Sequence, residues 1–188
     1  DKLLDAAQEL MLSRGYVATS VDGICSAAGV TKGSFFHYFD NKEDLGKVLL
    51  ERFASRQAET MMSACAAKED PLDRIYCLID GAIQSSRDPE MKGCLIGTFA
   101  QEISETHPEL KAVCQASFDG FSQGMGADFV AAKERYCPDA GFDAEGLGRM
   151  FLALAQGSML ILRANGDRAA MGRNLVHFRE YLKTLYGR

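Results

Sequence analysis

The chain has 188 residues, a formal net charge of -5 at pH 7, and 47% hydrophobic residues. This composition excludes a disordered chain and allows one large domain, or a small domain joined to a larger one. The acidic balance excludes a non-specific nucleic-acid binder, which would be strongly basic.

The sequence shows no secretory signal, because no basic segment precedes an apolar run and a small-residue cleavage site near its start. The most apolar run, residues 150–162, is too short to span a bilayer and is interrupted by Gln156 and Ser158. We therefore expect a cytoplasmic protein with no membrane contact.

The beginning of the chain predicts two short helices. Apolar residues recur at helical spacing over residues 3–11, and Gly15 can end this helix with a left-handed cap. The same spacing returns over residues 21–28, where Thr19 or Ser20 can serve as the N-cap.

A sharp turn and a third short helix follow. Gly29 lies within a run of small residues, 27–30, where two helices must turn and touch, and residues 32–39 predict a helix that buries Phe35 and Phe39. Three helices within roughly forty residues, with a glycine turn between the last two, are typical of a helix-turn-helix. Ordinary helical hairpins share such turns. The outward face of the third helix must therefore distinguish a DNA-binding helix-turn-helix from an ordinary helical hairpin.

That outward face offers hydrogen-bonding, stacking and close-approach groups instead of the Glu, Lys and Ala of an ordinary helix surface. Its residues are Lys32, Gly33, Ser34, Phe36, His37 and Tyr38. Gly33 allows the backbone to approach a duplex, and Lys32 and Ser34 suit base edges or phosphates. The face therefore favours DNA binding.

A long fourth helix is expected from Asn41, a good N-cap, to about Lys68. Glu43 and Asp44 complement the helix dipole in its first turn. Lys42 adds a positive side chain to the positive end of the helix, which predicts an anion site with phosphate as its ligand.

The segment from Ser20 to Leu45, SVDGICSAAGVTKGSFFHYFDNKEDL, resembles the DNA-binding signature of the TetR family of bacterial transcriptional regulators. The resemblance implies that Ser20 and Lys42 contact phosphates. It also implies that the start of the third helix lies in the major groove, where the contacting residues are Lys32, Gly33 and Ser34, and that His37 and Tyr38 reach bases or backbone. The family often has tyrosine at the position of Phe36, so a hydroxyl contact is missing there.

The rest of the chain predicts further helices and no strand. They are expected from Pro71 over about fifteen residues, over 94–104, over 108–136, over 144–164 and over 168–185. We therefore expect an all-α fold of about nine helices.

Two domains are expected within this fold. Residues 1–46 form the three-helix DNA-binding domain, and residues 47–188 form a larger ligand-binding and dimerisation domain. In the resembling family the last two helices pair with their counterparts in a homodimer. The apolar face that suits this interface consists of Met150, Phe151, Leu154, Gly157, Ser158 and Ile161.

Soft and aromatic side chains in the middle helices predict a pocket for a largely apolar small-molecule inducer, with Glu102, Gln101 or Tyr76 to orient it. The candidate contacts are Met61, Met62, Cys65, Tyr76, Phe99, Glu102, Phe118 and Phe121.

The six cysteines form no CxxC pair and the three histidines lie far apart, so neither a metal site nor a cofactor is predicted. Most cysteines are expected to be reduced, buried thiols. Cys94 follows Lys92 and Gly93 at an expected helix start, where dipole and cation favour thiolate. An electrophile or oxidant sensor at Cys94 is therefore an alternative within the same family.

No catalytic set is recognised. The run from Gly120 to Gly126 has the glycines of a phosphate loop but no preceding strand. The favoured function is a repressor of double-stranded operator DNA that a small molecule releases. The other alternative is a helical module that binds a ligand or partner without DNA.

Overall fold

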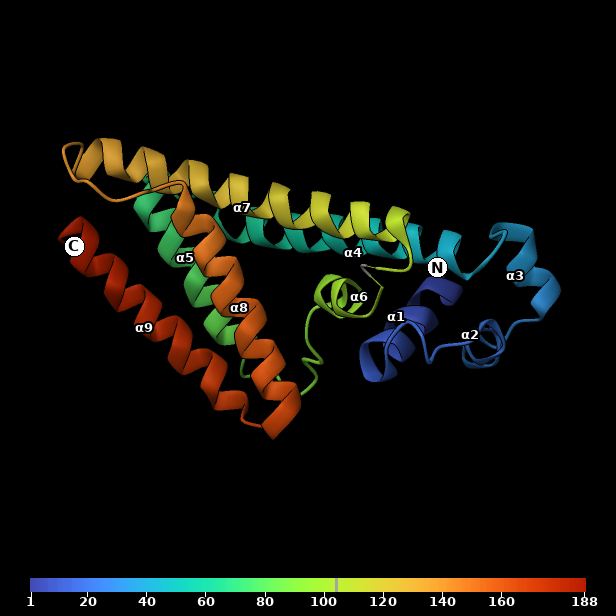
Figure 1. Ribbon diagram of the computed structural model, residues 1–188. Helices are drawn as coiled ribbons and strands as arrows, with labels where there is room; N and C mark the ends of the chain where they lie inside the picture. The colour runs from blue at the N-terminus through green and yellow to red at the C-terminus, as the bar shows by residue number, and fades with distance from the viewer. Residues whose placement is uncertain (104) are drawn as a thin grey trace. The chain divides into compact units, whose positions relative to one another are not determined.

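A computed structural model of the protein describes residues 1–103 and 105–188, without the side chain of Met62. Every regular element in this described part is an α-helix (Figure 1). The helices are α1 (Lys2–Arg14), α2 (Val21–Ala28), α3 (Lys32–Tyr38), α4 (Lys42–Cys65), α5 (Pro71–Ser85), α6 (Leu95–Ile103), α7 (Pro108–Tyr136), α8 (Gly146–Asn165) and α9 (Arg168–Tyr186). The all-α prediction, with its helix-turn-helix at the start, is confirmed.

The chain forms two compact units. Unit 1 consists of Asp1–Arg56 and Lys92–Ser117, and unit 2 of Gln57–Met91 and Phe118–Arg188. Unit 1 therefore holds more than the predicted DNA-binding domain, because α6 packs against α1 within it. A boundary after Gly46 falls inside α4, which continues without a break.

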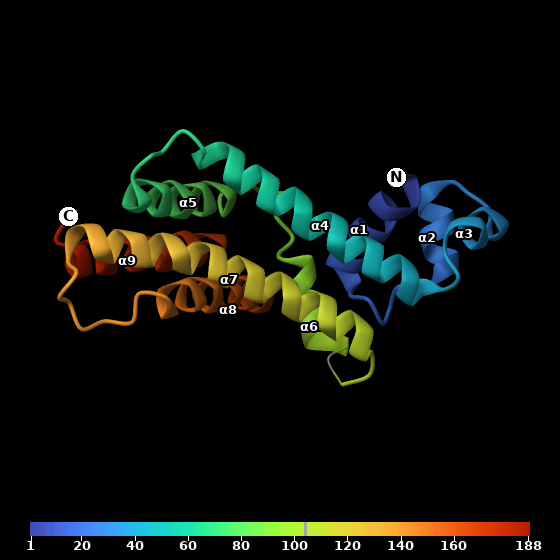
Figure 2. The same cartoon turned by 90° about the horizontal axis from the view of Figure 1, so that it is seen from above.

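Unit 1 places α1, α2 and α3 beside the beginning of α4 (Figure 2). The predicted cap at Gly15 takes a different form from the expected one: its φ of 88° is positive, but its ψ of 168° lies outside the left-handed helical region. Its N–H donates to the carbonyl of Met11, and the chain then enters a turn over residues 16–18, where the N–H of Thr19 donates to the carbonyl of Tyr16 at 3.2 Å.

Gly29 makes the turn between α2 and α3. It has φ 65° and ψ 35°, the left-handed conformation that side-chain-bearing residues rarely adopt, and its N–H donates to the carbonyl of Cys25. Val30 also donates its N–H to this carbonyl, at 3.0 Å. The glycine therefore reverses the chain within a few residues, as a helix-turn-helix requires.

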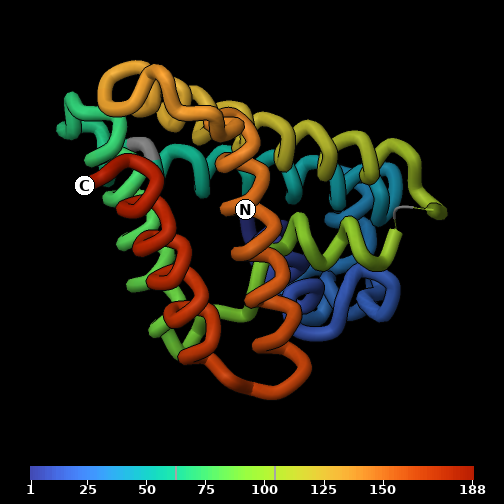
Figure 3. The backbone as a smooth tube through the Cα atoms, turned by 60° about the vertical axis from the view of Figure 1, so that its left-hand side comes forward, coloured from blue at the N-terminus to red at the C-terminus, as the bar shows by residue number. Residues whose placement is uncertain are grey.

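Unit 2 is built around an apolar core shared by α5, α7, α8 and α9. Figure 3 shows α9 beside both α5 and α8, in agreement with their backbone contacts. Phe129 and Phe178 meet edge to face in the core, with ring centroids 6.4 Å apart, and Tyr186 donates its hydroxyl proton to the Phe129 carbonyl at 2.9 Å. Burying such aromatic rings stabilises the unit and fixes the surface that α8 and α9 leave outside.

The apolar face predicted on α8 is divided in the structure. Phe151 and Ser158 point into their own subunit, and Ser158 accepts a hydrogen bond from Asn174 at 3.0 Å. This corrects their assignment to the outer face, because the helical period turns them toward α9. Met150 and Ile161 are exposed as predicted. Within the described residues, none of the helices has the length and apolarity that crossing a membrane needs.

Candidate nucleic-acid interface

On α3, the side chains that the sequence predicts to contact DNA point toward solvent. Phe35 is fully buried beneath it and holds it on the unit, whereas Phe36 and Tyr38 are 55% and 69% exposed. Lys32, Gly33 and His37 are exposed as well, and Ser34 is half-buried. The exposed face of α3 thus combines two aromatic rings, which can stack, with polar groups that can form hydrogen bonds.

Hydroxyl caps fix the start of both short helices. The Ser20 hydroxyl accepts from the N–H of Gly23 at 3.1 Å, and the Thr31 hydroxyl accepts from the N–H of Ser34 at 3.2 Å. An accepting hydroxyl still has its own proton to donate, so Ser20 can cap α2 and contact a phosphate at once. Thr31 was not among the predicted residues, although a threonine before a short helix is a common cap.

Lys32 is paired on the exposed surface with Asp22 of α2, with 2.7 Å between ammonium nitrogen and carboxylate oxygen. Sequence reasoning missed Asp22, since nothing in the local pattern shows that α2 brings it beside α3. Asp22 places a negative charge on the face that DNA would approach.

Lys42 is half-buried, and its ammonium group donates to the backbone carbonyls of Tyr16 and Thr19, each at 2.9 Å. The nitrogen also lies 4.2 Å from the centre of the Tyr16 ring. Partial burial lowers the pKa of Lys42 below 10.5, while the negative charge of Glu102 raises it. Lys42 therefore ties the start of α4 to the turn before α2, with one ammonium proton left for another acceptor.

Tyr16 links this turn to α6 and to the start of α7. Its ring lies 5.0 Å from that of Phe99 and 5.3 Å from that of His107, measured between centroids. Burial, followed by the nearby charge of Glu43, raises the pKa of Tyr16 to about 12. Its position after a helix-ending glycine is the only sequence signal that could have drawn attention to it.

The residues predicted for the inducer are distributed over both compact units. Phe99 is fully buried in unit 1, where it packs on Tyr16. Glu102 is exposed and accepts from the N–H of Val17 at 3.0 Å, so its carboxylate is already used at the turn. Unit 2 contains Met61, Cys65, Tyr76, Phe118 and Phe121. The predicted contact of Met62 concerns a side chain outside the described part of the chain.

Within unit 2 the predicted residues have separate surroundings. Phe121 stacks on Phe151 with centroids 6.0 Å apart, and Tyr76 donates its hydroxyl proton to the carbonyl of Arg188 at 3.2 Å. In this structure Cys65 forms a disulfide with Cys77, so the prediction of reduced thiols does not describe this state of the pair. The sequence could not show this, because only the fold brings the end of α4 beside α5.

An open groove of about 570 Å³ lies elsewhere in unit 2, between the end of α5 and the start of α9. It is lined by Ile83, Ser86, Arg87, Arg168, Ala169, Gly172, Arg173, Val176 and His177. None of these residues was predicted to bind a ligand. Two of its arginines already have partners. Arg168 donates to the carbonyls of Asp88 and Met91, and Arg173 donates to the carboxylate of Asp167.

Cys94 lies immediately before α6, as predicted, and is half-buried. Its expected cationic neighbour Lys92 is paired with Glu9 at 3.3 Å. The other thiol close to it, Cys114, is buried, and this burial, together with the charge of Cys94, raises the pKa of Cys114 to about 11. The surroundings therefore supply less positive charge to Cys94 than the sequence suggested.

A helix-turn-helix with an exposed polar and aromatic recognition face defines a DNA-binding transcriptional regulator. The chain belongs to the TetR family. A family model described as bacterial regulatory proteins, tetR family, matches residues 3–48, and one described as the tetracyclin repressor-like C-terminal domain matches residues 71–178. Regulators of this family bind operator DNA and act as dimers.

Named relatives agree with this assignment. The chain is similar to the transcriptional regulator AcuR of Cereibacter sphaeroides, with 29% identity over 84% of this chain and 73% of AcuR. It is 25% identical to the transcriptional repressor DhaR of a Mycobacterium species, over 92% of this chain and 86% of DhaR. A solved TetR regulatory protein from Rhodobacter sphaeroides superimposes with a TM-score of 0.84 and 26% identity, covering 94% of this chain and 95% of that chain.

Proposed function

We propose that this regulator is a repressor that reads its operator with α3 and leaves the DNA when an apolar small molecule binds. The observation that carries the proposal is the face of α3: buried Phe35 anchors the helix, while Phe36 and Tyr38 remain exposed to solvent. Among its relatives, DhaR is named a repressor. This function requires a cytoplasmic location, because the operator DNA lies there.

The contacts to DNA divide by chemistry. Lys32 and Ser34, at the start of α3, suit base edges in the major groove, and His37 and Tyr38 suit bases or sugar-phosphate. Ser20 and Lys42 suit phosphates, because each has a proton to donate beyond its contacts within the protein. Phe36 has no hydroxyl and can only stack on, or pack against, the DNA.

Dimerisation through α8 and α9 follows from the apolar side chains that these helices leave outside. They are Met150, Leu160, Ile161, Val176 and Tyr181, each more than 40% exposed. Gly157 lies on α8, and a side chain added there would meet nothing within 4 Å in its own subunit. An exposed apolar face with a small residue suits the close crossing of partner helices.

The inducer is expected to be apolar because the candidate residues that are not already hydrogen-bonded are aromatic or sulfur-containing. Phe118 and Phe121 of α7 are half-buried, which leaves part of each ring for a ligand. Glu102 is a weaker candidate than the sequence suggested, since its carboxylate is occupied by Val17.

The proposal is tested by fluorescence anisotropy with duplexes from the DNA upstream of the coding region. A pseudo-palindromic duplex should bind tightly, and a scrambled duplex of equal length should bind at least about a thousand-fold more weakly. A screen of apolar compounds should then find one that dissociates the complex. Equal binding of both duplexes by the folded dimer would reject the proposed function.

A further inference from the structure

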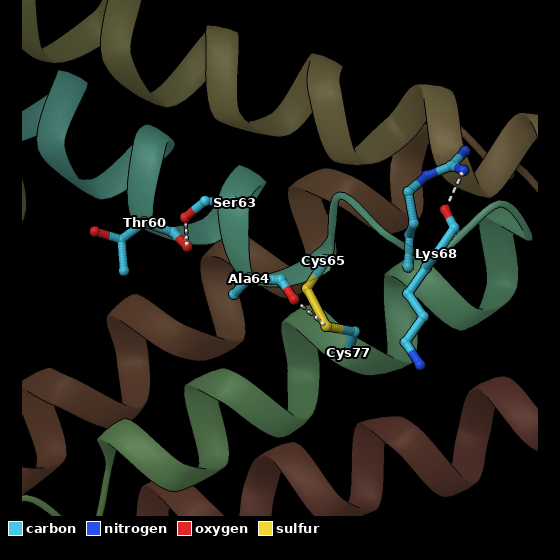
Figure 4. The surroundings of a disulfide bond; sticks show 7 residues. Thr60, Ser63, Ala64, Cys65, Lys68 and Cys77 are labelled. Atoms are coloured by element: carbon cyan, nitrogen blue, oxygen red, sulfur yellow. Dashed lines mark hydrogen bonds between the residues drawn. A yellow bond between two sulfur atoms is a disulfide. The ribbon is translucent and has the colours of Figure 1, made fainter.

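The end of α4 and the second turn of α5 are joined by the disulfide between Cys65 and Cys77 (Figure 4). The two Cα atoms lie 5.9 Å apart, a separation typical of cysteines that can pair without backbone movement. Both residues belong to unit 2, so the geometry of the pair is set within one compact body.

Other contacts hold the two segments together independently of the sulfur bond. Arg74 donates to the carbonyls of Lys68 and Glu69, at 3.0 and 2.9 Å, and its guanidinium also pairs with Asp128. Asp70 caps α5 by accepting from the N–H of Leu72 at 2.8 Å. The connection between the helices is therefore built to keep the two cysteines in reach of each other when they are reduced.

The pair also suits both oxidation states. The sulfur of Cys77 lies 3.7 Å from the carbonyl oxygen of Ala64, to which a reduced thiol can donate. Cys77 is half-buried, whereas Cys65 is only 4% exposed. A small oxidant can therefore reach the first sulfur, and the second can attack it from inside the protein.

A regulator that works on cytoplasmic DNA is surrounded by reductants that keep protein disulfides rare, and those that form there are commonly redox-sensing. This step rests on the location proposed above. It predicts that Cys65 and Cys77 are thiols at rest and join only when an oxidant is present.

We propose that Cys65 and Cys77 form a reversible dithiol–disulfide site for peroxides. The Cys77 thiolate attacks a peroxide oxygen and becomes a sulfenic acid; the O–O bond breaks, and the leaving hydroxide or alkoxide takes a proton from solvent. The Cys65 thiolate then attacks that sulfur, the S–S bond forms as the S–O bond breaks, and the leaving hydroxide takes a proton from solvent to become water. Hydrogen peroxide is reduced to two waters overall, and a dithiol reductant restores both thiols by exchange.

The test uses full-length reduced protein and hydrogen peroxide without DNA, so that its failure is separate from failure of the proposed function. Thiol titration should fall from all six cysteines to four, and dithiothreitol should restore six. Tryptic mapping should find residues 57–68 linked to residues 75–87. Linkage of another pair, oxidation of Cys77 beyond sulfenic acid without linkage, or a bond that resists dithiothreitol would overturn the proposal.

Variants separate this site from Cys94. Cys94→Ser should still form the 65–77 linkage, whereas Cys77→Ser should lose it. Oxidation should raise the melting temperature of wild type by roughly 5–10 °C, because the bond closes a short loop, and should leave that of Cys77→Ser unchanged. Because wild-type mapping needs no substitution, the proposal remains testable if a variant fails to fold.

Discussion

The carboxylate of Glu102 in α6 accepts a hydrogen bond from the backbone N–H of Val17, at 3.0 Å, in the turn that leads into α2. The Glu102 carboxylate lies so close to Gly15 that any side chain at position 15 would collide with it. Two segments far apart in sequence therefore meet at the entrance to the helix-turn-helix, and both belong to unit 1.

Glu102→Ala should lower the free energy of unfolding by about 1 kcal/mol, because the N–H of Val17 loses its acceptor. Glu102→Gln keeps an acceptor oxygen and should lose less. Urea denaturation measures both. Glu105→Ala, on the same stretch and exposed, is the matched control and should change little. Equal stability of Glu102→Ala and Glu105→Ala would show that the hydrogen bond does not support the turn.

The pair between Asp22 and Lys32 predicts a substitution that strengthens non-specific binding. Asp22→Asn removes a negative charge from the face that we propose approaches DNA, and it frees the Lys32 ammonium, which now lies 2.7 Å from the carboxylate. Affinity for a scrambled duplex should rise several-fold. Glu51→Gln, an equal change of charge at an exposed position of α4, should have a smaller effect. A rise of the same size in both variants would mean that net charge alone is responsible.

Sequence reasoning was effective where the relevant pattern is local. Helical spacing placed α2 and α3, Gly29 marked their turn, and the outward face of α3 followed from the same period. The positions of Phe36 and Tyr38 at the surface confirm that the period was interpreted correctly.

Sequence reasoning was less effective where residues meet through the tertiary fold. Glu102 was assigned to a pocket because apolar residues surround it in sequence, but the fold places its carboxylate at the backbone of Val17. The helix-dipole argument for Lys42 did not show that two carbonyls accept from its ammonium group. The sequence also did not reveal the pairing of Cys65 with Cys77, because this pairing depends on how α4 and α5 are joined.

The lowered pKa of Asp70 predicts that this residue stabilises the fold at neutral pH and that the stabilisation is lost in acid. Burial raises the pKa of its carboxyl, but the hydrogen bond from Tyr136, the N–H groups of Leu72 and Asp73, and the charge of Arg135 together lower it below 3.8. A carboxyl with a lowered pKa stabilises the fold above its unfolded-state pKa, near 3.8, and this contribution is lost as pH falls through the folded-state value.

Asp70→Asn keeps a capping side chain but has no charge to titrate. Wild type should therefore be more stable than Asp70→Asn at neutral pH, and the difference should shrink as pH falls below about 4. Urea denaturation of both proteins at a series of pH values checks this. A difference that stays constant down to pH 3 would show that the charge of Asp70 contributes nothing.

The proposed dimer face predicts the effect of a charge at Gly157. Gly157→Glu should yield folded monomers, because the added side chain meets nothing in its own subunit but would bury a carboxylate between partners. Sedimentation and circular dichroism distinguish a monomer from an unfolded chain. Gly81→Glu in α5, another helical glycine with open space around it, is the control and should remain dimeric. A dimeric Gly157→Glu protein would place the interface elsewhere.

Recognition of operator DNA by α3 is tested most directly by the salt dependence of binding in wild type and in Lys32→Ala, Ser34→Ala and Lys42→Ala. Loss of one phosphate contact should lower the slope of log affinity against log salt by about 0.9. We predict this for Lys42→Ala with all duplexes alike, and an altered base preference for Lys32→Ala and Ser34→Ala. Unchanged affinity, slope and base preference in all three folded variants would contradict the account.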